Sequence, residues 1–131
     1  MPADKELMGA STALVVLGCL QNGPSYGYEL LRRINTEAAG LFAWREGTLY
    51  PVLHRLEHEG LLRAQWQDSE SAKVPGEGRP RKYYYITAKG RKHLANSARQ
   101  WQAFHALITR LAGSVPPDTS TGRNPRTLEQ V

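Results

Sequence analysis

The sequence is poor in the residues that build covalent frameworks and catalytic centres. Its 131 residues include a single cysteine, Cys19, which excludes an intrachain disulfide. It has no Gly-Xaa-Ser-Xaa-Gly segment, no phosphate-binding glycine loop and no carboxylate pair on a recognisable scaffold, so we do not expect an enzyme. His54 and His58 have the i, i+4 spacing of zinc ligands, but no third ligand is evident nearby, so we expect no metal site and no cofactor.

Long apolar runs are also missing. A membrane-spanning helix needs about 18 apolar residues in succession, and no segment reaches that length. Residues 7–20 are rich in apolar side chains but too short, and residues 1–6 lack the basic flank of a signal peptide. We therefore expect a cytoplasmic protein with no membrane partner.

The charge that is present is mostly positive. Lys and Arg number 17 against 12 Asp and Glu, which gives a formal net charge of +5. Residues 61–92 hold eight of these cations and three of the acids, so the net positive charge of this segment equals that of the whole chain. Nucleic acid is therefore the first candidate partner, with a basic but otherwise ordinary soluble protein as the alternative.

Two helices are predicted in the first forty residues. The first spans residues 5–21 and has a wide apolar face that includes Leu14, as expected of a helix in the core or at a subunit contact. Ser25 is expected to cap the second, which runs to residue 39. The residues expected to face inward on this second helix are Tyr28, Leu31 and Ile34, with Leu30 beside them, and those expected to point outward are Arg32 and Arg33.

A third helix is the strongest local signal in the chain. Its apolar residues follow the i, i+3, i+4, i+7 spacing of one helix face: Leu49, Val52, Leu53 and Leu56. Gly60 supplies a left-handed residue just past its end. The opposite face carries Thr48, Tyr50, His54, Arg55 and His58. Arg45 cannot cap this helix by accepting a hydrogen bond, and Pro51 lacks an N–H, so we expect an irregular first turn.

The second half predicts a hairpin and a long helix. Strands at residues 61–66 and 82–86 flank a polar, basic loop. Thr87 is expected to cap a helix over residues 88–112, which would be about 37 Å long. That length exceeds the small module beneath it, so its apolar stripe needs another partner, and a second copy of the helix is the simplest one. The apolar residues in question include Trp101, Phe104 and Ile108.

Three helices followed by a basic hairpin describe a winged helix-turn-helix, so the expected fold class is mainly α (α+β) with a long C-terminal dimerisation helix. We expect a DNA-binding domain at 5–86, the dimerisation helix at 87–113 and a disordered tail at 114–131. The candidate DNA contacts are Tyr26, Thr48, Tyr50, Arg55, Arg79, Arg81 and Lys82. The alternatives are half-buried packing for the tyrosines and a solvated basic loop for the cations of the hairpin.

Three motifs carry a family resemblance over roughly residues 7–112. They are Ser25-Tyr26-Gly27-Tyr28-Glu29-Leu30, then Gly47-Thr48-Leu49-Tyr50-Pro51 with Arg55-Leu56-Glu57 and Gly60-Leu61, then Gly78-Arg79-Pro80-Arg81-Lys82-Tyr83-Tyr84 with Ile86-Thr87 and Gly90. In this order and spacing they resemble the PadR-like transcriptional regulators. The single final helix is similar to that of the family's shorter subfamily.

The resemblance implies a dimeric repressor whose last helix swaps across to the partner subunit, bound to a palindromic double-stranded DNA operator. Some members of the shorter subfamily respond to aromatic or cationic drugs held between the subunits on a tryptophan, and Trp101 occupies the matching place. The expected effector-binding or dimer-interface residues are Leu14, Trp101, Phe104 and Ile108. Trp101 as core filler stays an alternative, as does a winged helix used for protein contacts without an effector.

Overall fold

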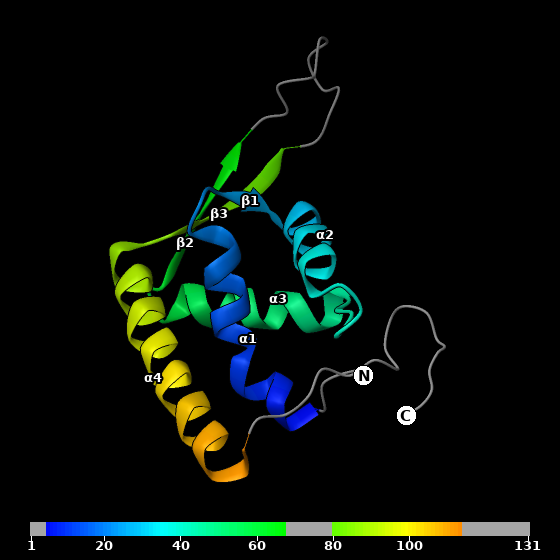
Figure 1. Cartoon of the computed structure of the whole chain (residues 1–131). Coiled ribbons are helices and arrows are strands. Elements are labelled where there is room, and N and C mark those ends of the chain that lie inside the picture. The colour runs from blue at the N-terminus through cyan, green and yellow to red at the C-terminus, as the bar shows by residue number, and fades with distance from the viewer. Residues whose placement is uncertain (1–4, 68–79, 114–131) are drawn as a thin grey trace.

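The computed structural model describes residues 5–67 and 80–113, which form four helices and a small sheet (Figure 1). The elements in chain order are α1 (Lys5–Leu20), β1 (Ser25–Tyr26), α2 (Gly27–Ala38), α3 (Glu46–His58), β2 (Leu62–Gln67), β3 (Arg81–Ile86) and α4 (Ala88–Ala112). The loop at 68–79, which includes Arg79, and the tail expected to be disordered at 114–131 lie outside the described residues.

One core lies between the first three helices and the sheet. The predicted apolar face of α3 is confirmed, because Leu49, Val52, Leu53 and Leu56 are all buried. The other buried apolar side chains come from each surrounding element: Val16, Leu17, Leu20, Leu30, Ile34, Trp44, Leu61, Leu62 and Tyr84. Burial of these side chains supplies most of the free energy that holds α3 against its neighbours.

The sheet has one strand more than the sequence predicted. Its order is β1-β3-β2 with antiparallel pairing, and Ser25 lies opposite Tyr84. The Ser25 side chain is buried, and its hydroxyl donates to a Glu29 carboxylate oxygen at 2.7 Å. The N-cap of α2 is Tyr26, with no side-chain cap hydrogen bond, so the predicted Ser25 cap is wrong.

Two predicted orientations on α2 are also wrong. Tyr28 is exposed rather than part of the apolar face, and the Arg32 guanidinium lies 5.9 Å from its ring centroid. Arg33 is half-buried rather than outward, and its guanidinium donates to the backbone carbonyl of Cys19 on α1. The buried face of α2 is made by Leu30 and Ile34. Arg33 therefore ties α2 to α1, which helps fix the platform beneath α3.

The connection from α2 to α3 is held by one amide side chain. The Asn35 amide nitrogen donates to the Trp44 carbonyl at 2.9 Å, and its amide oxygen accepts from the Trp44 N–H at 2.8 Å. Trp44 itself is buried, so its backbone groups have few other partners available. This pair of bonds sets the direction in which the chain enters α3.

The two ends of α3 behave differently. Arg45 is the N-cap and makes no side-chain cap bond, as predicted, but the helix continues without a break through Pro51, so the expected irregular first turn is not found. At the other end Gly60 has φ +79°, as predicted. Gly60 donates to the Glu57 carbonyl, and Leu61 donates to the Leu56 carbonyl at 2.9 Å, which is a Schellman motif.

The start of α4 is fixed to the end of α3. The Thr87 hydroxyl accepts from the Gly90 N–H at 2.9 Å, which confirms the predicted cap, and it donates to the Gly60 carbonyl at 2.7 Å. Gly90 is needed here because a Cβ at this position would overlap the Leu61 carbonyl oxygen and lie 2.8 Å from an Ile86 side-chain carbon. The direction in which α4 leaves the module is therefore set by close backbone contact.

The arrangement is the winged helix-turn-helix predicted from the sequence, mainly helical with a small antiparallel sheet and a long last helix. In Figure 1 the hairpin strands β2 and β3 project past the helices at one end, whereas α4 runs toward the other. Among the helices that the structure describes, none is both long and apolar enough to span a bilayer.

Candidate nucleic-acid interface

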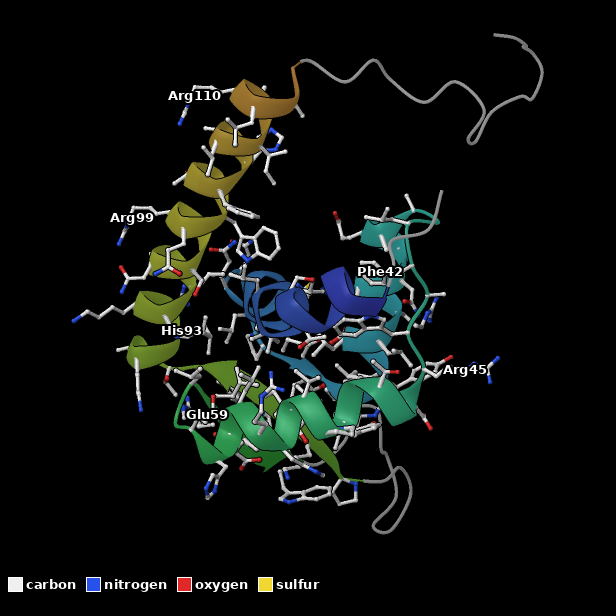
Figure 2. The ribbon with its side chains drawn as sticks, turned by 90° about the horizontal axis from the view of Figure 1, so that it is seen from below. Phe42, Arg45, Glu59, His93, Arg99 and Arg110 are labelled. Carbon is white, nitrogen blue, oxygen red and sulfur yellow. The ribbon has the colours of Figure 1, made fainter. Side chains whose placement is uncertain are left out.

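The outward face of α3 is polar and open. Its exposed side chains include Thr48, His54, Arg55 and His58, as the sequence predicted, and Glu46 and Pro51 are exposed on the helix as well. Figure 2 shows α3 along one edge of the molecule, with Arg45 at one end and Glu59 at the other. This face offers hydroxyl, imidazole and guanidinium groups, which are the kinds of groups that hydrogen-bond to base edges and phosphates. The contacts of Thr48 and Arg55 with DNA remain predictions.

Tyr50 does not lie on this open face. It is half-buried, and its ring packs so closely on Gly27 that a Cβ there would lie 2.8 Å from a ring carbon. Burial, with a smaller contribution from Glu46, raises the pKa of the Tyr50 phenol. Burial also raises the pKa of Tyr84 to about 12, with Glu57 and then Tyr50 adding to the shift. Both tyrosines thus have environments in which burial disfavours the phenolate form.

The outer face of the sheet carries a cluster of arginine and tyrosine. The Arg81 guanidinium lies 4.4 Å from the centroid of the Tyr26 ring, and Tyr26 meets Tyr83 edge-on at 5.5 Å. On the same face Arg63 lies 4.2 Å from the Tyr85 ring centroid. Stacking on an aromatic ring orients each guanidinium without neutralising it. The structure thus brings two predicted DNA residues, Tyr26 and Arg81, together toward the loop end of the described hairpin strands.

Lys82 lies on the opposite face of the sheet. Its ammonium is 3.7 Å from a Glu57 carboxylate oxygen on α3 and 5.5 Å from the Tyr84 ring centroid. Directly across from it in the register is Trp66, which exposes 65% of its surface. Trp66 was not among the residues predicted to bind DNA, although the alternation of Leu62, Ala64 and Trp66 along β2 places all three on one face of the strand. The predicted cations of the hairpin are therefore divided between the two faces of the sheet.

The surface of α4 changes character along its length. Its first half contacts the module, where Leu94 packs on the core, and Trp101 is half-buried. The large apolar residues beyond Trp101 are between 38% and 78% exposed: Phe104, Leu107, Ile108 and Leu111. Figure 2 shows the labelled Arg99 and Arg110 on the side of α4 that points away from the body. An uncovered apolar stripe thus begins beyond Trp101.

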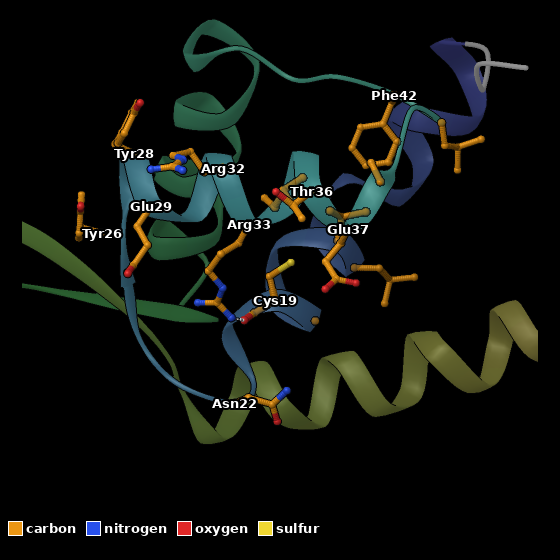
Figure 3. Close-up of a pocket in the computed structure, with 16 residues that line it drawn as sticks. Cys19, Asn22, Tyr26, Tyr28, Glu29, Arg32, Arg33, Thr36, Glu37 and Phe42 are labelled. Carbon is orange, nitrogen blue, oxygen red and sulfur yellow. Dashed lines mark hydrogen bonds between the residues drawn. The ribbon is translucent and has the colours of Figure 1, made fainter. Parts of the chain in front are cut away.

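An open cavity of about 840 Å³ lies between α1 and α2 (Figure 3). Its lining includes Leu14 and Cys19 from α1 and Phe42 from the segment between α2 and α3. Burial raises the pKa of the Cys19 thiol, a shift that Arg33 opposes and Glu37 reinforces. Of the four predicted effector or interface residues only Leu14 lines this cavity, whereas the other three lie on α4. Within the described residues no three His, Cys, Asp or Glu side chains form a metal-binding group.

Comparison with known proteins gives consistent results. The family model described as "Transcriptional regulator PadR-like family" matches residues 16–96. A curated relative from Lysinibacillus sphaericus, which bears the name "Uncharacterized protein X", is 30% identical over 94 residues, which are 72% of this chain and 81% of that protein.

Several solved structures share the fold. A transcriptional regulator from Clostridium thermocellum superposes with a TM-score of 0.71 at 26% identity, over 82% of this chain and 96% of that one. A PadR family transcriptional regulator from Eggerthella lenta gives 0.68 at 30% identity, over 84% and 88%. A PadR-like transcriptional regulator from Bacillus cereus gives 0.70 at 26% identity, over 85% and 100%.

Proposed function

The chain belongs to the PadR-like family of transcriptional regulators, and from this premise we propose that it works as a dimeric repressor on a palindromic DNA operator. The family and the similar solved structures are regulators and not enzymes. The observation that carries the proposal is the polar outward face of α3, together with a hairpin whose strands bear Arg81 and Lys82 next to the loop.

In the proposed complex α3 enters the major groove, which is about 12 Å wide and admits one helix. Thr48 and Arg55 would then face base edges and phosphates. Arg81 and Lys82, one on each face of the hairpin, would bind phosphates beside the groove. Tyr26 would support Arg81 through the observed stacking, and any contact of Tyr50 with a phosphate would be through its hydroxyl at the rim of the α2–α3 contact.

The proposed dimer places the distal half of α4 against a second copy. Four large apolar side chains are exposed there, and a two-fold pairing would cover all four in both protomers. Residues 5–86 then act as the DNA-binding unit and residues 87–113 as the dimerisation helix. The two-fold axis would present two α3 helices to two half-sites, which is why the operator is proposed to be palindromic.

The proposed effector is a small aromatic or hydrophobic molecule held between the subunits. Trp101 is a suitable stacking surface for such a molecule because it is half-buried at the boundary between the covered and uncovered parts of α4. The exposed Phe104 follows it one helical turn later. Leu14 on α1 is half-buried and offers a further apolar contact. A ligand stacked on Trp101 would change the angle between the two α4 helices and hence the spacing of the two α3 helices, which would release the operator.

Binding to the DNA upstream of the coding sequence tests this function. The full chain should bind a duplex from that region, and its affinity should fall steeply with salt because phosphate contacts release counterions. Arg55→Ala should weaken binding, whereas the matched Arg99→Ala, on the side of α4 that points away from the body, should not. A shallow salt dependence with equal affinities for both variants would instead favour a winged helix used for protein contacts.

A further inference from the structure

Trp66 is exposed where the hairpin strands extend beyond the ends of the helices. Along β2 the residues on its side of the sheet are Leu62, which is buried, Ala64, which is half-buried, and Trp66, which exposes 65% of its surface. Tyr84, opposite Ala64, is still buried. The helical cover therefore ends between Ala64 and Trp66. Figure 1 shows the hairpin strands projecting past the helices in this way.

The side of the hairpin that carries Trp66 is the side that faces α3. Lys82 lies directly opposite Trp66 in the antiparallel register, and directly opposite residues share one face of a sheet. The Lys82 ammonium is 3.7 Å from the Glu57 carboxylate of α3, so this face turns toward the helix proposed to enter the major groove. Trp66 and Lys82 thus lie on the α3 side of the hairpin, beyond the buried Tyr84, whereas Arg63, Tyr83 and Tyr85 lie on the other face.

We propose that Trp66 is a positioning contact for the sugar–phosphate backbone that borders the groove occupied by α3. The proposal rests on the DNA-binding function proposed above. A helix in the major groove has a phosphate backbone on either side, and a hairpin stem beside that helix faces one of them. The indole suits this neighbour because its ring packs on apolar deoxyribose while its N–H donates to a phosphate oxygen.

Lys82 and Glu57 complete the contact. Their ion pair is partly exposed and long, so it holds the lysine beside Trp66 without competing strongly with a phosphate. On DNA the ammonium would move from the carboxylate to a phosphate oxygen next to the indole. Contacts of this kind fix the register of α3 in the groove and carry no sequence information of their own. Trp66 should therefore affect specific and non-specific duplexes alike.

Acrylamide quenching of tryptophan fluorescence tests the contact directly. The chain has three tryptophans, of which Trp44 is buried and Trp101 half-buried, so the exposed Trp66 should dominate the quenchable signal. Trp66→Phe assigns that signal. Acrylamide is uncharged and leaves the ionic strength unchanged, which matters because phosphate contacts depend on salt. Addition of a short duplex at low salt should protect the signal in the wild type and leave Trp66→Phe nearly unaffected.

Variants give the second readout. Trp66→Ala should weaken duplex binding about tenfold, measured by fluorescence anisotropy of labelled DNA, on both upstream and unrelated duplexes. Trp66→Phe should fall between alanine and the wild type, because it keeps a ring and loses the N–H. The matched control is Gln65→Ala, the preceding residue on the opposite face of the same strand, which should bind as the wild type does. Circular dichroism should show the same fold for all three.

Each other result overturns the inference. If the duplex binds but Trp66 stays quenchable and Trp66→Ala keeps its affinity, the contact is wrong while the proposed function stands. If Trp66 is already protected in the free protein, another chain covers it and not DNA. If the wild type binds no duplex even at low salt, the proposed function and the contact fail together.

Discussion

Replacing Ile108 by glutamate should separate the proposed dimer into folded monomers. Ile108 exposes 45% of its surface in the protomer, within the apolar stripe on the distal half of α4. Full burial of an isoleucine side chain contributes about 1.5–3 kcal/mol, so covering the exposed part contributes about 1 kcal/mol in each protomer. The two-fold axis repeats the contact, which gives about 2 kcal/mol, or about 30-fold in the dimer Kd.

The glutamate adds a cost of its own. Two carboxylates would enter an apolar seam without partners, and each would lose at least about 1 kcal/mol of hydration. The two effects sum to about 4 kcal/mol, so the dimer Kd should rise by about 1,000-fold in total. The protomer should keep its thermal stability, because the replaced side chain contacts little of the module.

Sedimentation equilibrium over a range of concentrations measures this dissociation constant. The control is Arg99→Glu, which places the same carboxylate on the same helix but on the side that points away from the body. It should leave the association unchanged. A wild-type dissociation constant for Ile108→Glu would refute the assignment of this stripe to the dimer, and an equal loss for Arg99→Glu would show a general charge effect instead.

Three further changes test how the module holds α3 and α4. Gly90→Ala should cost about 1–3 kcal/mol of unfolding free energy in urea, because the new methyl group overlaps the Leu61 carbonyl, and unchanged stability would mean that α4 is not seated as described. Asn35→Ala should cost about 2 kcal/mol through the two lost bonds to the Trp44 backbone, and a neutral result in the same assay would contradict their role. Burial holds the pKa of Tyr84 at about 12 against an ordinary value of 10.0, so the folded chain keeps this proton after the unfolded chain has lost it. The contribution of Tyr84 to stability should be full below pH 10 and fall by about 1.4 kcal/mol per pH unit toward pH 12. Thermal melts of Tyr84→Phe should show a shallower loss than the wild type over this range, and identical slopes would show that Tyr84 does not titrate in this way.

The features predicted correctly from the sequence depend on near neighbours in the chain. The apolar spacing of α3, the left-handed Gly60 and the Thr87 cap each involve residues within one or two helical turns. Helix periodicity and end signals are local physics, so one sequence is enough to find them. The order of helices and strands followed from these signals, and with it the winged-helix fold.

The features that the sequence analysis missed depend on distant partners. Ser25 has the chemistry of a cap, but its pairing with Tyr84, far along the chain, draws it into a strand instead. A tyrosine ring can lie at the protein surface or in the interior, so the sequence does not distinguish Tyr28 from Tyr50. The packing of α2 on α3 is what makes Tyr50 half-buried and leaves Tyr28 exposed. Arg81 and Lys82 are consecutive in a strand and therefore lie on opposite faces, but only the packing of the sheet decides that the face of Lys82 turns toward α3.

The most direct test of the account is a hydroxyl-radical footprint of the full chain on the DNA upstream of its coding sequence. Two α3 helices related by a two-fold axis should protect two blocks about one helical turn apart, roughly 34–36 Å between centres. Ile108→Glu should lose the paired pattern at concentrations where the wild type shows it. A single protected block for the wild-type dimer, or no protection at low salt, would contradict the claim that two copies read DNA through α3.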